Sequence, residues 1–281
     1  MHVKEYKLNH NSLAFVHSIM QPAEKDLIHG PESHKKFEII YLVQGEVRYN
    51  IEHEQYHVRA GDIIFVMPNE IHTLVINRST VYERILVYFD YALLRKMFAV
   101  ADIETDDTFL SLRNVNRIIP HRLVSKYCIK DTIYNIASVD PEDKSACFRF
   151  MSLIFDLIVK LNNSAADTGE AILPISKDPM IKSIIDYVES HIFEPIKLDD
   201  IANHLYISKS ALCHRFSDHM KITINRYIAI KKIHYAAELI QGGMSATNAA
   251  IAAGYNHYTT FYHNYKQIMG SAPTAGKSET T

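Results

Sequence analysis

The spacing of hydrophobic residues changes near residue 90, and this change constrains the fold more than any other feature. Between Phe37 and Asp90, short runs rich in β-branched and aromatic residues end at turn residues at intervals of roughly 8–12 positions. Beyond Asp90 the apolar residues recur three and four positions apart, as in Met151, Ile154 and Ile158, which is the period of an amphipathic helix. The sequence therefore predicts an antiparallel sandwich or barrel followed by helices.

A small, polar segment divides the helical part of the chain. Apolar stripes predict helices over 91–100, 122–137 and 145–161, and residues 162–177 then read as a linker. We expect an α+β chain of two domains, as its 281 residues also suggest. Residues 1–161 form an antiparallel β-barrel (about 10–90) with a helical annex (about 91–161), and residues 178–281 form an all-α domain.

Composition narrows the class of protein without naming a partner. Hydrophobic residues make up 47% of the chain and charged residues 22%, which is typical of a globular protein. We expect a cytoplasmic protein with no membrane segment, because no apolar run is long enough to span a bilayer. The three cysteines form no C-x-x-C pair and are predicted to be buried, reduced thiols. The net charge of −2 gives no general case for binding nucleic acid, so any basic surface must be local.

Residues 178–281 repeat one local pattern, a short helix, a tight turn and a longer helix. The first copy runs from a helix at 199–205 to a helix that begins after Ser208, and the second from 245–253 to 257–269. A helix over 224–241 connects them and spans roughly 27 Å at about 1.5 Å per residue. Two helix-turn-helix units so spaced could enter successive major grooves of double-stranded DNA, about 34 Å apart. A helical domain that binds protein instead of DNA is the alternative.

This region resembles the AraC/XylS-type transcription regulators. The resemblance rests on the runs 198–216, 232–236 and 249–273, and the last run matches the family pattern at Gly254, Tyr255, Phe261, Tyr265, Lys266, Gly270 and Pro273. It implies a sequence-specific regulator of promoter DNA, usually an activator that contacts RNA polymerase, although a repressor would look the same in sequence.

The resemblance also assigns residues to DNA. The residues opposite the apolar positions of the two longer helices would face the grooves: Ser210, Cys213, His214 and Ser217 in the first unit, and Tyr258, Thr259, Tyr262 and His263 in the second. Lys266 and the helix N-termini would face phosphates. The chain departs from the family at Ser217-Asp218, Lys221 and Lys232, where it has fewer cations or lacks a usual glycine or arginine. We therefore expect weaker non-specific binding than in a typical member.

The strand-rich half resembles the cupin-like sensor domain that such regulators carry. The residues that carry this resemblance are His34, Glu38, Gly45, Gly61-Asp62, Pro68 and His72. In metal-dependent cupins a similar pattern binds a transition metal, but here Glu32 replaces the first histidine. Three interpretations follow: the groups bind a small polar ligand at the barrel mouth, which we favour, or they bind a metal in an enzyme, or they make structural hydrogen bonds.

The predicted effector is a sugar or a related metabolite, a choice that rests on the resemblance alone. The candidate ligand-binding residues are His34, Glu38, Tyr41, Arg48 and His72. Strand alternation puts Glu38 and Tyr41 on opposite faces, so both can contact one ligand only across a bulge. The resemblance also implies a homodimer through the annex helices, with intramolecular packing as the alternative.

The overall hypothesis is a ligand-responsive transcription regulator that is not an enzyme and needs no cofactor. The first alternative is a metal-dependent cupin enzyme with a helical regulatory appendage. The second is a constitutive DNA-binding protein in which the barrel is only structural.

Overall fold

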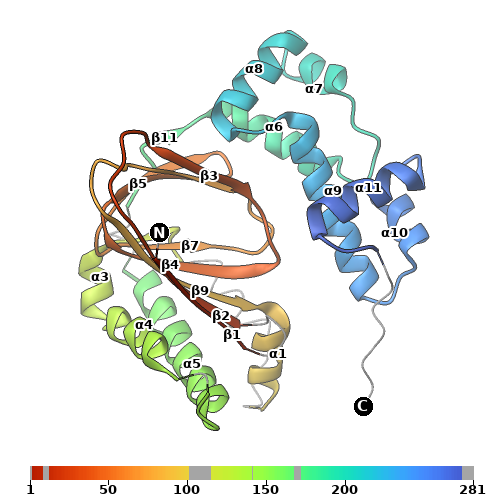
Figure 1. The fold of residues 1–281 in the computed structure, drawn as a ribbon. Coiled ribbons are helices and arrows are strands. Elements are labelled where there is room, and N and C mark those ends of the chain that lie inside the picture. Colours follow the sequence, from red (N-terminus) through yellow and green to blue (C-terminus); the bar gives the residue numbers. More distant parts are fainter. Residues whose placement is uncertain (1, 9–12, 101–114, 141, 168–171, 274–281) are drawn as a thin grey trace. The chain divides into compact units, whose positions relative to one another are not determined.

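The computed structural model describes residues 2–8, 13–100, 115–140, 142–167 and 172–273. It divides into two compact units, Met1–Ser176 and Lys177–Thr281. The N-terminal unit contains the strands, and the C-terminal unit is helical (Figure 1).

Two sheets build the N-terminal unit, so its predicted barrel is not closed. The first sheet has the order β1 (His2–Leu8), β2 (Leu13–Met20), β9 (Tyr82–Asp90), β4 (Lys36–Gln44), β7 (Ile63–Val66) and β10 (Ile118–Ile119). The second has the order β11 (Ser176–Lys177), β6 (Glu54–Arg59), β5 (Glu46–Ile51), β8 (His72–Ile76) and β3 (Leu27–Glu32). Strand β4 is antiparallel to β9 and β7, and β5 is antiparallel to β6 and β8. The predicted order of antiparallel strands followed by helices is confirmed.

Each face of the first sheet packs against a different layer. Ile40 and Leu42 of β4 are buried with Tyr49 and Leu74 of the second sheet, so this face forms the core between the sheets. The alternate residues of β4 pack with the helices on the other face. Successive side chains of a strand point to opposite faces, and this alternation decides which polar residues can lie between the sheets.

Helices cover the outer face of the first sheet, as the annex prediction requires (Figure 1). They are α1 (Tyr91–Val100), α3 (His121–Lys126), α4 (Ile129–Ser138) and α5 (Ala146–Ala165). The single helix predicted over 122–137 is wrong, because Cys128 has a left-handed backbone (φ 51°) that separates α3 from α4. Helix α5 also continues past the predicted end at residue 161 and includes Ser164, which is buried and donates a hydrogen bond to the Leu161 carbonyl. Part of the predicted annex, 101–114, and part of the predicted linker, 168–171, lie outside the described residues.

The C-terminal unit follows the predicted helices closely. It consists of α6 (Pro179–Ser190), α7 (Leu198–His204), α8 (Lys209–Met220), α9 (Ile224–Gln241), α10 (Ala246–Ala252) and α11 (Tyr258–Met269). Ser208 accepts a hydrogen bond from the Ala211 amide and so caps α8 as expected. None of the helices in the described part of the chain combines the length and apolar character that a membrane crossing requires.

The turns of the two helix-turn-helix units have the same backbone conformation. The residue that follows the first helix by two positions is left-handed in both, Tyr206 with φ 55° and Gly254 with φ 69°. The next amide then donates back into the helix, Ile207 to the Ala202 carbonyl and Tyr255 to the Ala250 carbonyl, both at 3.0 Å. The second turn has one more residue before its longer helix. This repeated geometry explains why the two units can be recognised from their spacing.

Candidate functional site

Three of the predicted ligand-binding residues converge at one end of the core between the sheets. Glu38 lies on the inward face of β4, His72 begins β8 opposite Glu32 and Ile51, and His34 precedes β4. Nε2 of His34 is 2.7 Å from Oε2 of Glu38, and Nε2 of His72 is 3.2 Å from the same oxygen. The Glu38 and His72 side chains are only 3% and 4% exposed, whereas His34 is 25% exposed and connects the cluster to solvent.

The electrostatics of this histidine–glutamate cluster favour a charged carboxylate. Burial raises the pKa of Glu38, but hydrogen bonds from His34 and His72 outweigh burial and hold the pKa well below its ordinary value. Burial lowers the pKa of His72, but the neighbouring Glu38 carboxylate reverses that effect and raises it. The cluster therefore presents an anionic oxygen between two imidazole rings.

Polar and aromatic groups from three further strands line the same interior. The Tyr49 ring stacks on His72 with centroids 6.0 Å apart, and Tyr88 meets the His34 ring edge-on at 5.3 Å. Arg84 lies beside Leu42 and Ser18 in the register of the first sheet, on the inward face. The Tyr49 hydroxyl, the Ser18 hydroxyl and Nε of Arg84 are buried and make no hydrogen bond within the described part of the chain. Buried polar atoms without partners are costly, so this interior offers bonds to a polar ligand.

Arg84 and Ser18 were not predicted as site residues. A usable signal was present, because Tyr82, Arg84, Leu86 and Tyr88 alternate along β9 and must share one face. The face that turns inward depends on the register between β9 and β4, which a single sequence does not reveal.

The other two predicted ligand-binding residues are not at the cluster. Tyr41 is buried on the helix-facing side of β4, where its ring meets Tyr134 at 6.1 Å. Arg48 is exposed on the outer face of β5 and lines a surface depression of about 260 Å³ with Glu46, His57 and Asn77. Both residues point away from the interior because their strands alternate.

The two predicted recognition helices each have a buried side and an exposed side. Leu212 and Phe216 of α8 and Phe261 of α11 are fully buried, and Tyr265 is 7% exposed, because residues at i and i+4 lie on one side of a helix. The residues predicted to face DNA lie on the opposite sides: Ser210, His214, Tyr258, Thr259, Tyr262, His263 and Lys266 are exposed, and Cys213 and Ser217 are half-buried. His214 and His263 occupy equivalent places, two positions before the second buried residue of each helix, Phe216 and Tyr265.

Polar contacts fix the positions of both recognition helices. Arg215 of α8 makes a two-pronged ion pair with Asp178, the N-cap of α6, at 2.9 and 3.0 Å. Arg226 of α9 donates to Gln267 of α11 at 2.8 Å. Lys232 of α9 is 5% exposed and donates to the carbonyls of Glu194 and Gly254 at 2.5 and 3.2 Å, so it holds the second turn in place. The role of Lys232 in this unit is therefore structural.

Comparison with known families decides the class of the protein. Residues 23–114 match the model of the AraC-like ligand-binding domain, and residues 201–277 match a helix-turn-helix domain model. The chain therefore combines an AraC-like ligand-binding domain with a helix-turn-helix domain. This assignment supports the predicted regulator over the predicted alternative of a metal-dependent cupin enzyme.

Relatives of this chain include helix-turn-helix regulators from Staphylococcus aureus. An uncharacterized HTH-type transcriptional regulator, SACOL0084 of strain COL, is 18% identical over 241 residues, which is 83% of this chain and 30% of the relative. The transcriptional regulatory protein HptR of strain bovine RF122 / ET3-1 is 24% identical over 115 residues, covering 40% of this chain and 46% of HptR. The chain thus spans about a third of the length of the regulators represented by SACOL0084.

Solved structures similar to the chain include ToxT from Vibrio cholerae. The alignment covers 93% of this chain and 96% of ToxT, with 15% identity and a TM-score of 0.38. A probable AraC-family transcriptional regulator from Rhodopseudomonas palustris CGA009 is 18% identical over 34% of this chain and 93% of that protein, with a TM-score of 0.33.

Proposed function

We propose that this chain is a transcription regulator that binds double-stranded promoter DNA through α8 and α11 and responds to a small-molecule effector bound between the sheets. The observation that carries the proposal is the pair of equivalent helix-turn-helix units, each with a buried core side and an exposed polar side, in a chain that also carries a ligand-binding domain. DNA is the partner because such units present their second helix to the major groove.

The exposed side chains divide into groups that read bases and groups that bind phosphates. His214 and His263 stand at equivalent positions of α8 and α11, where one imidazole could meet one base edge in each of two grooves. Lys266 lies on the same side of α11 and can neutralise a phosphate. The N-cap of α11, His257, makes no side-chain cap, so the first amides of this helix are available to a phosphate oxygen.

The effector site in this proposal is the cluster of His34, Glu38 and His72 with Tyr49 and Arg84 around it. Carboxylate, imidazole, hydroxyl and guanidinium groups can donate to and accept from the hydroxyls of a sugar or a related metabolite. The three buried polar atoms without partners support this location.

The remaining parts of the proposal concern assembly and output. Helix α5 exposes Phe148 and Val159, which are 78% and 55% exposed and could meet a second copy of the chain, so we propose a homodimer.

We further propose that the regulator activates transcription in the cytoplasm by contacting RNA polymerase. The effector must act by population shift, because it can change DNA binding only if it binds the DNA-competent state with a different affinity.

A selection from genome fragments with the full-length protein tests the proposal. We expect recovery of a motif with two half-elements about one helical turn apart, protected from nuclease by the wild-type chain. Thermal-shift screening with a sugar panel should then reveal an effector that stabilises the wild type. No enrichment of any sequence by folded protein would contradict the DNA-binding role. Enrichment with no stabilising metabolite would favour the constitutive alternative.

A further inference from the structure

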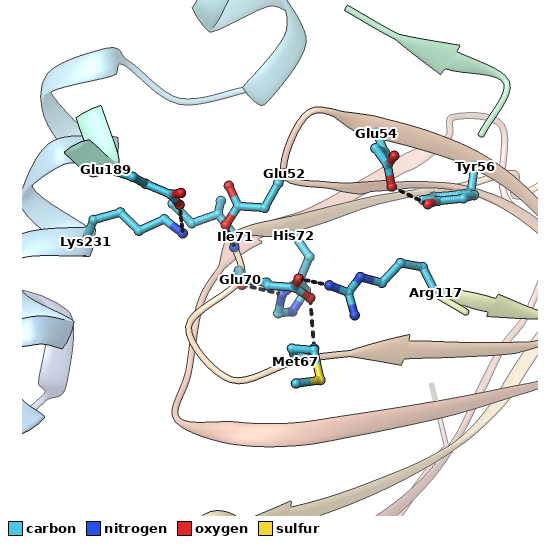
Figure 2. Close-up of polar contacts among 10 residues, drawn as sticks. All are labelled: Glu52, Glu54, Tyr56, Met67, Glu70, Ile71, His72, Arg117, Glu189 and Lys231. Carbon is cyan, nitrogen blue, oxygen red and sulfur yellow. Dashed lines mark hydrogen bonds and ion pairs between the residues drawn. The ribbon is translucent and has the colours of Figure 1, made fainter. Parts of the chain in front are cut away.

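A charged depression lies on the outer face of the second sheet, apart from the interior proposed for the effector. Tyr56 of β6 is buried in the core between the sheets, and its hydroxyl donates to Glu54 (Figure 2). The next residue, His57, therefore points outward, as does Arg48 of β5, which stands before the buried Tyr49. A molecule bound on this outer face is a second ligand with contacts of its own.

Two rows of side chains cross the outer face and border the depression, whose volume is about 260 Å³. In the first row, Arg48 lies between His57 of β6 and Val75 of β8. In the second row, Glu46 of β5 lies beside Asn77, the residue that follows β8. The rows are two residues apart along β5, which is about 7 Å. A small ligand can therefore contact both rows at once.

The second row is anionic. Glu46 accepts a hydrogen bond from Nδ2 of Asn77 at 2.8 Å, and Nε2 of His57 lies 3.2 Å from its other carboxylate oxygen. These two bonds hold the pKa of Glu46 below its ordinary value, so the group is a carboxylate at neutral pH. Asp26, which directly precedes β3, adds a second carboxylate to the lining of the depression. Two negative groups thus line this part of the outer face.

The first row is cationic beside an apolar surface. Arg48 is exposed, and it makes no hydrogen bond or ion pair with any other residue in the described part of the chain. Its planar guanidinium can bind a carboxylate through two parallel hydrogen bonds, which are stronger than contacts between neutral groups. Further along the row, Val75 lies opposite Ile28 of β3, which is 57% exposed. The row therefore offers a partner for a carboxylate next to a surface for an apolar group.

Opposite charges on the two rows select a ligand that carries both charges. A simple anion would be repelled by Glu46 and Asp26, and a simple amine would be repelled by Arg48, because like charges at close range oppose binding. A zwitterion with adjacent carboxylate and ammonium groups meets each row with the opposite charge. The volume lies just below that of pockets for drug-sized ligands, which begins at about 300 Å³, so the molecule must be small.

We propose that this depression binds a free apolar α-amino acid, whose carboxylate pairs with Arg48 and whose ammonium group lies between Glu46 and Asp26. The side chain of the amino acid then lies against Val75 and Ile28. An acidic or basic side chain would bring a like charge to one of the rows, so apolar amino acids bind best. The site does not depend on the proposed function, because it needs neither DNA nor the interior between the sheets.

Calorimetric titration of the full-length chain with L-valine, L-leucine and L-isoleucine tests the site. We expect at least one of them to bind with one-to-one stoichiometry and to raise the melting temperature. Analogues that lack one charge should bind at least about tenfold more weakly; for leucine these are isocaproate, without the ammonium group, and isoamylamine, without the carboxylate. No binding of the three amino acids at millimolar concentration would overturn the proposal, as would an analogue that binds equally well.

Two substitutions in the depression locate the ligand. Arg48→Gln and Glu46→Gln should each lower the affinity at least about tenfold, and circular dichroism establishes that both variants are folded. The matched control is Arg95→Gln, which removes the same charge from an exposed arginine of α1. This control should keep full affinity, and an equal loss there would contradict the proposal because only net charge would then matter. Full affinity in Arg48→Gln would also overturn it, because the amino acid would then bind elsewhere, such as between the sheets.

Discussion

Replacing Gly254 by alanine separates two contributions to the stability of the C-terminal unit. Gly254 ends α10 with φ 69°, and Gly270 ends α11 with φ 71°, so alanine at either position meets nearly the same backbone strain. A left-handed L-residue costs roughly 1–2 kcal/mol. At Gly270 nothing lies within 4 Å of a Cβ, so Gly270→Ala should lose only that amount.

Crowding makes Gly254 different. A Cβ there would lie 2.8 Å from the Phe193 carbonyl oxygen, 2.9 Å from that of Glu194 and 2.7 Å from Nζ of Lys232. The two oxygens belong to the backbone and cannot rotate away, so overpacking adds about 1–3 kcal/mol. We expect Gly254→Ala to lose roughly 2–5 kcal/mol in total, and to bind DNA more weakly because the second turn orients α11.

Equilibrium urea unfolding of the full-length chain, followed by far-ultraviolet circular dichroism, measures both losses. Gly270→Ala is the matched control for strain. Equal losses in the two variants would refute the reasoning, because they would mean that the contacts between Gly254, Lys232 and the Phe193–Glu194 carbonyls carry no weight.

Three other substitutions test separate contacts. His263→Ala should weaken binding to the selected DNA by about 1–3 kcal/mol and spare unrelated DNA, as competition titrations can show; equal losses on both would exclude base reading. Lys266→Ala should weaken binding to all sequences and reduce the salt slope by about one, whereas an unchanged slope would exclude a phosphate contact. Burial raises the pKa of Asp178, but the bonds from Arg215 and the helix amides lower it further, so the folded pKa is below the unfolded one. The Asp178–Arg215 ion pair therefore stabilises the folded state above about pH 4, and this stabilisation disappears as the pH falls. Urea titrations should therefore show that the free energy of unfolding falls less below that pH in Asp178→Asn than in the wild type.

Local signals in the sequence predicted the C-terminal unit well. The N-cap Ser208, the turn at Gly254 and the buried pairs Leu212–Phe216 and Phe261–Tyr265 depend on residues within a few positions of one another. The structural role of Lys232 was missed, because the carbonyls that it bonds lie 38 and 22 residues away along the chain.

The N-terminal site was predicted only in part, because some of its residues come together through strand pairing. The resemblance supplied His34, Glu38 and His72, but the sequence alone gave no register to place Arg84 beside them. The position of Arg48 was readable, since Val47, Tyr49 and Ile51 alternate with it and are buried. The prediction that Arg48 binds the effector did not use this alternation.

The central claim is that a ligand in the N-terminal unit changes the affinity of the C-terminal unit for DNA. The most direct measurement is the Kd of the full-length chain for its selected duplex, with and without the effector, in the wild type and in His72→Ala. The account predicts a change of about 5–150-fold in the wild type and none in the variant, which should still bind DNA. The same Kd with and without an effector known to bind would contradict it, as would a change that persists in His72→Ala.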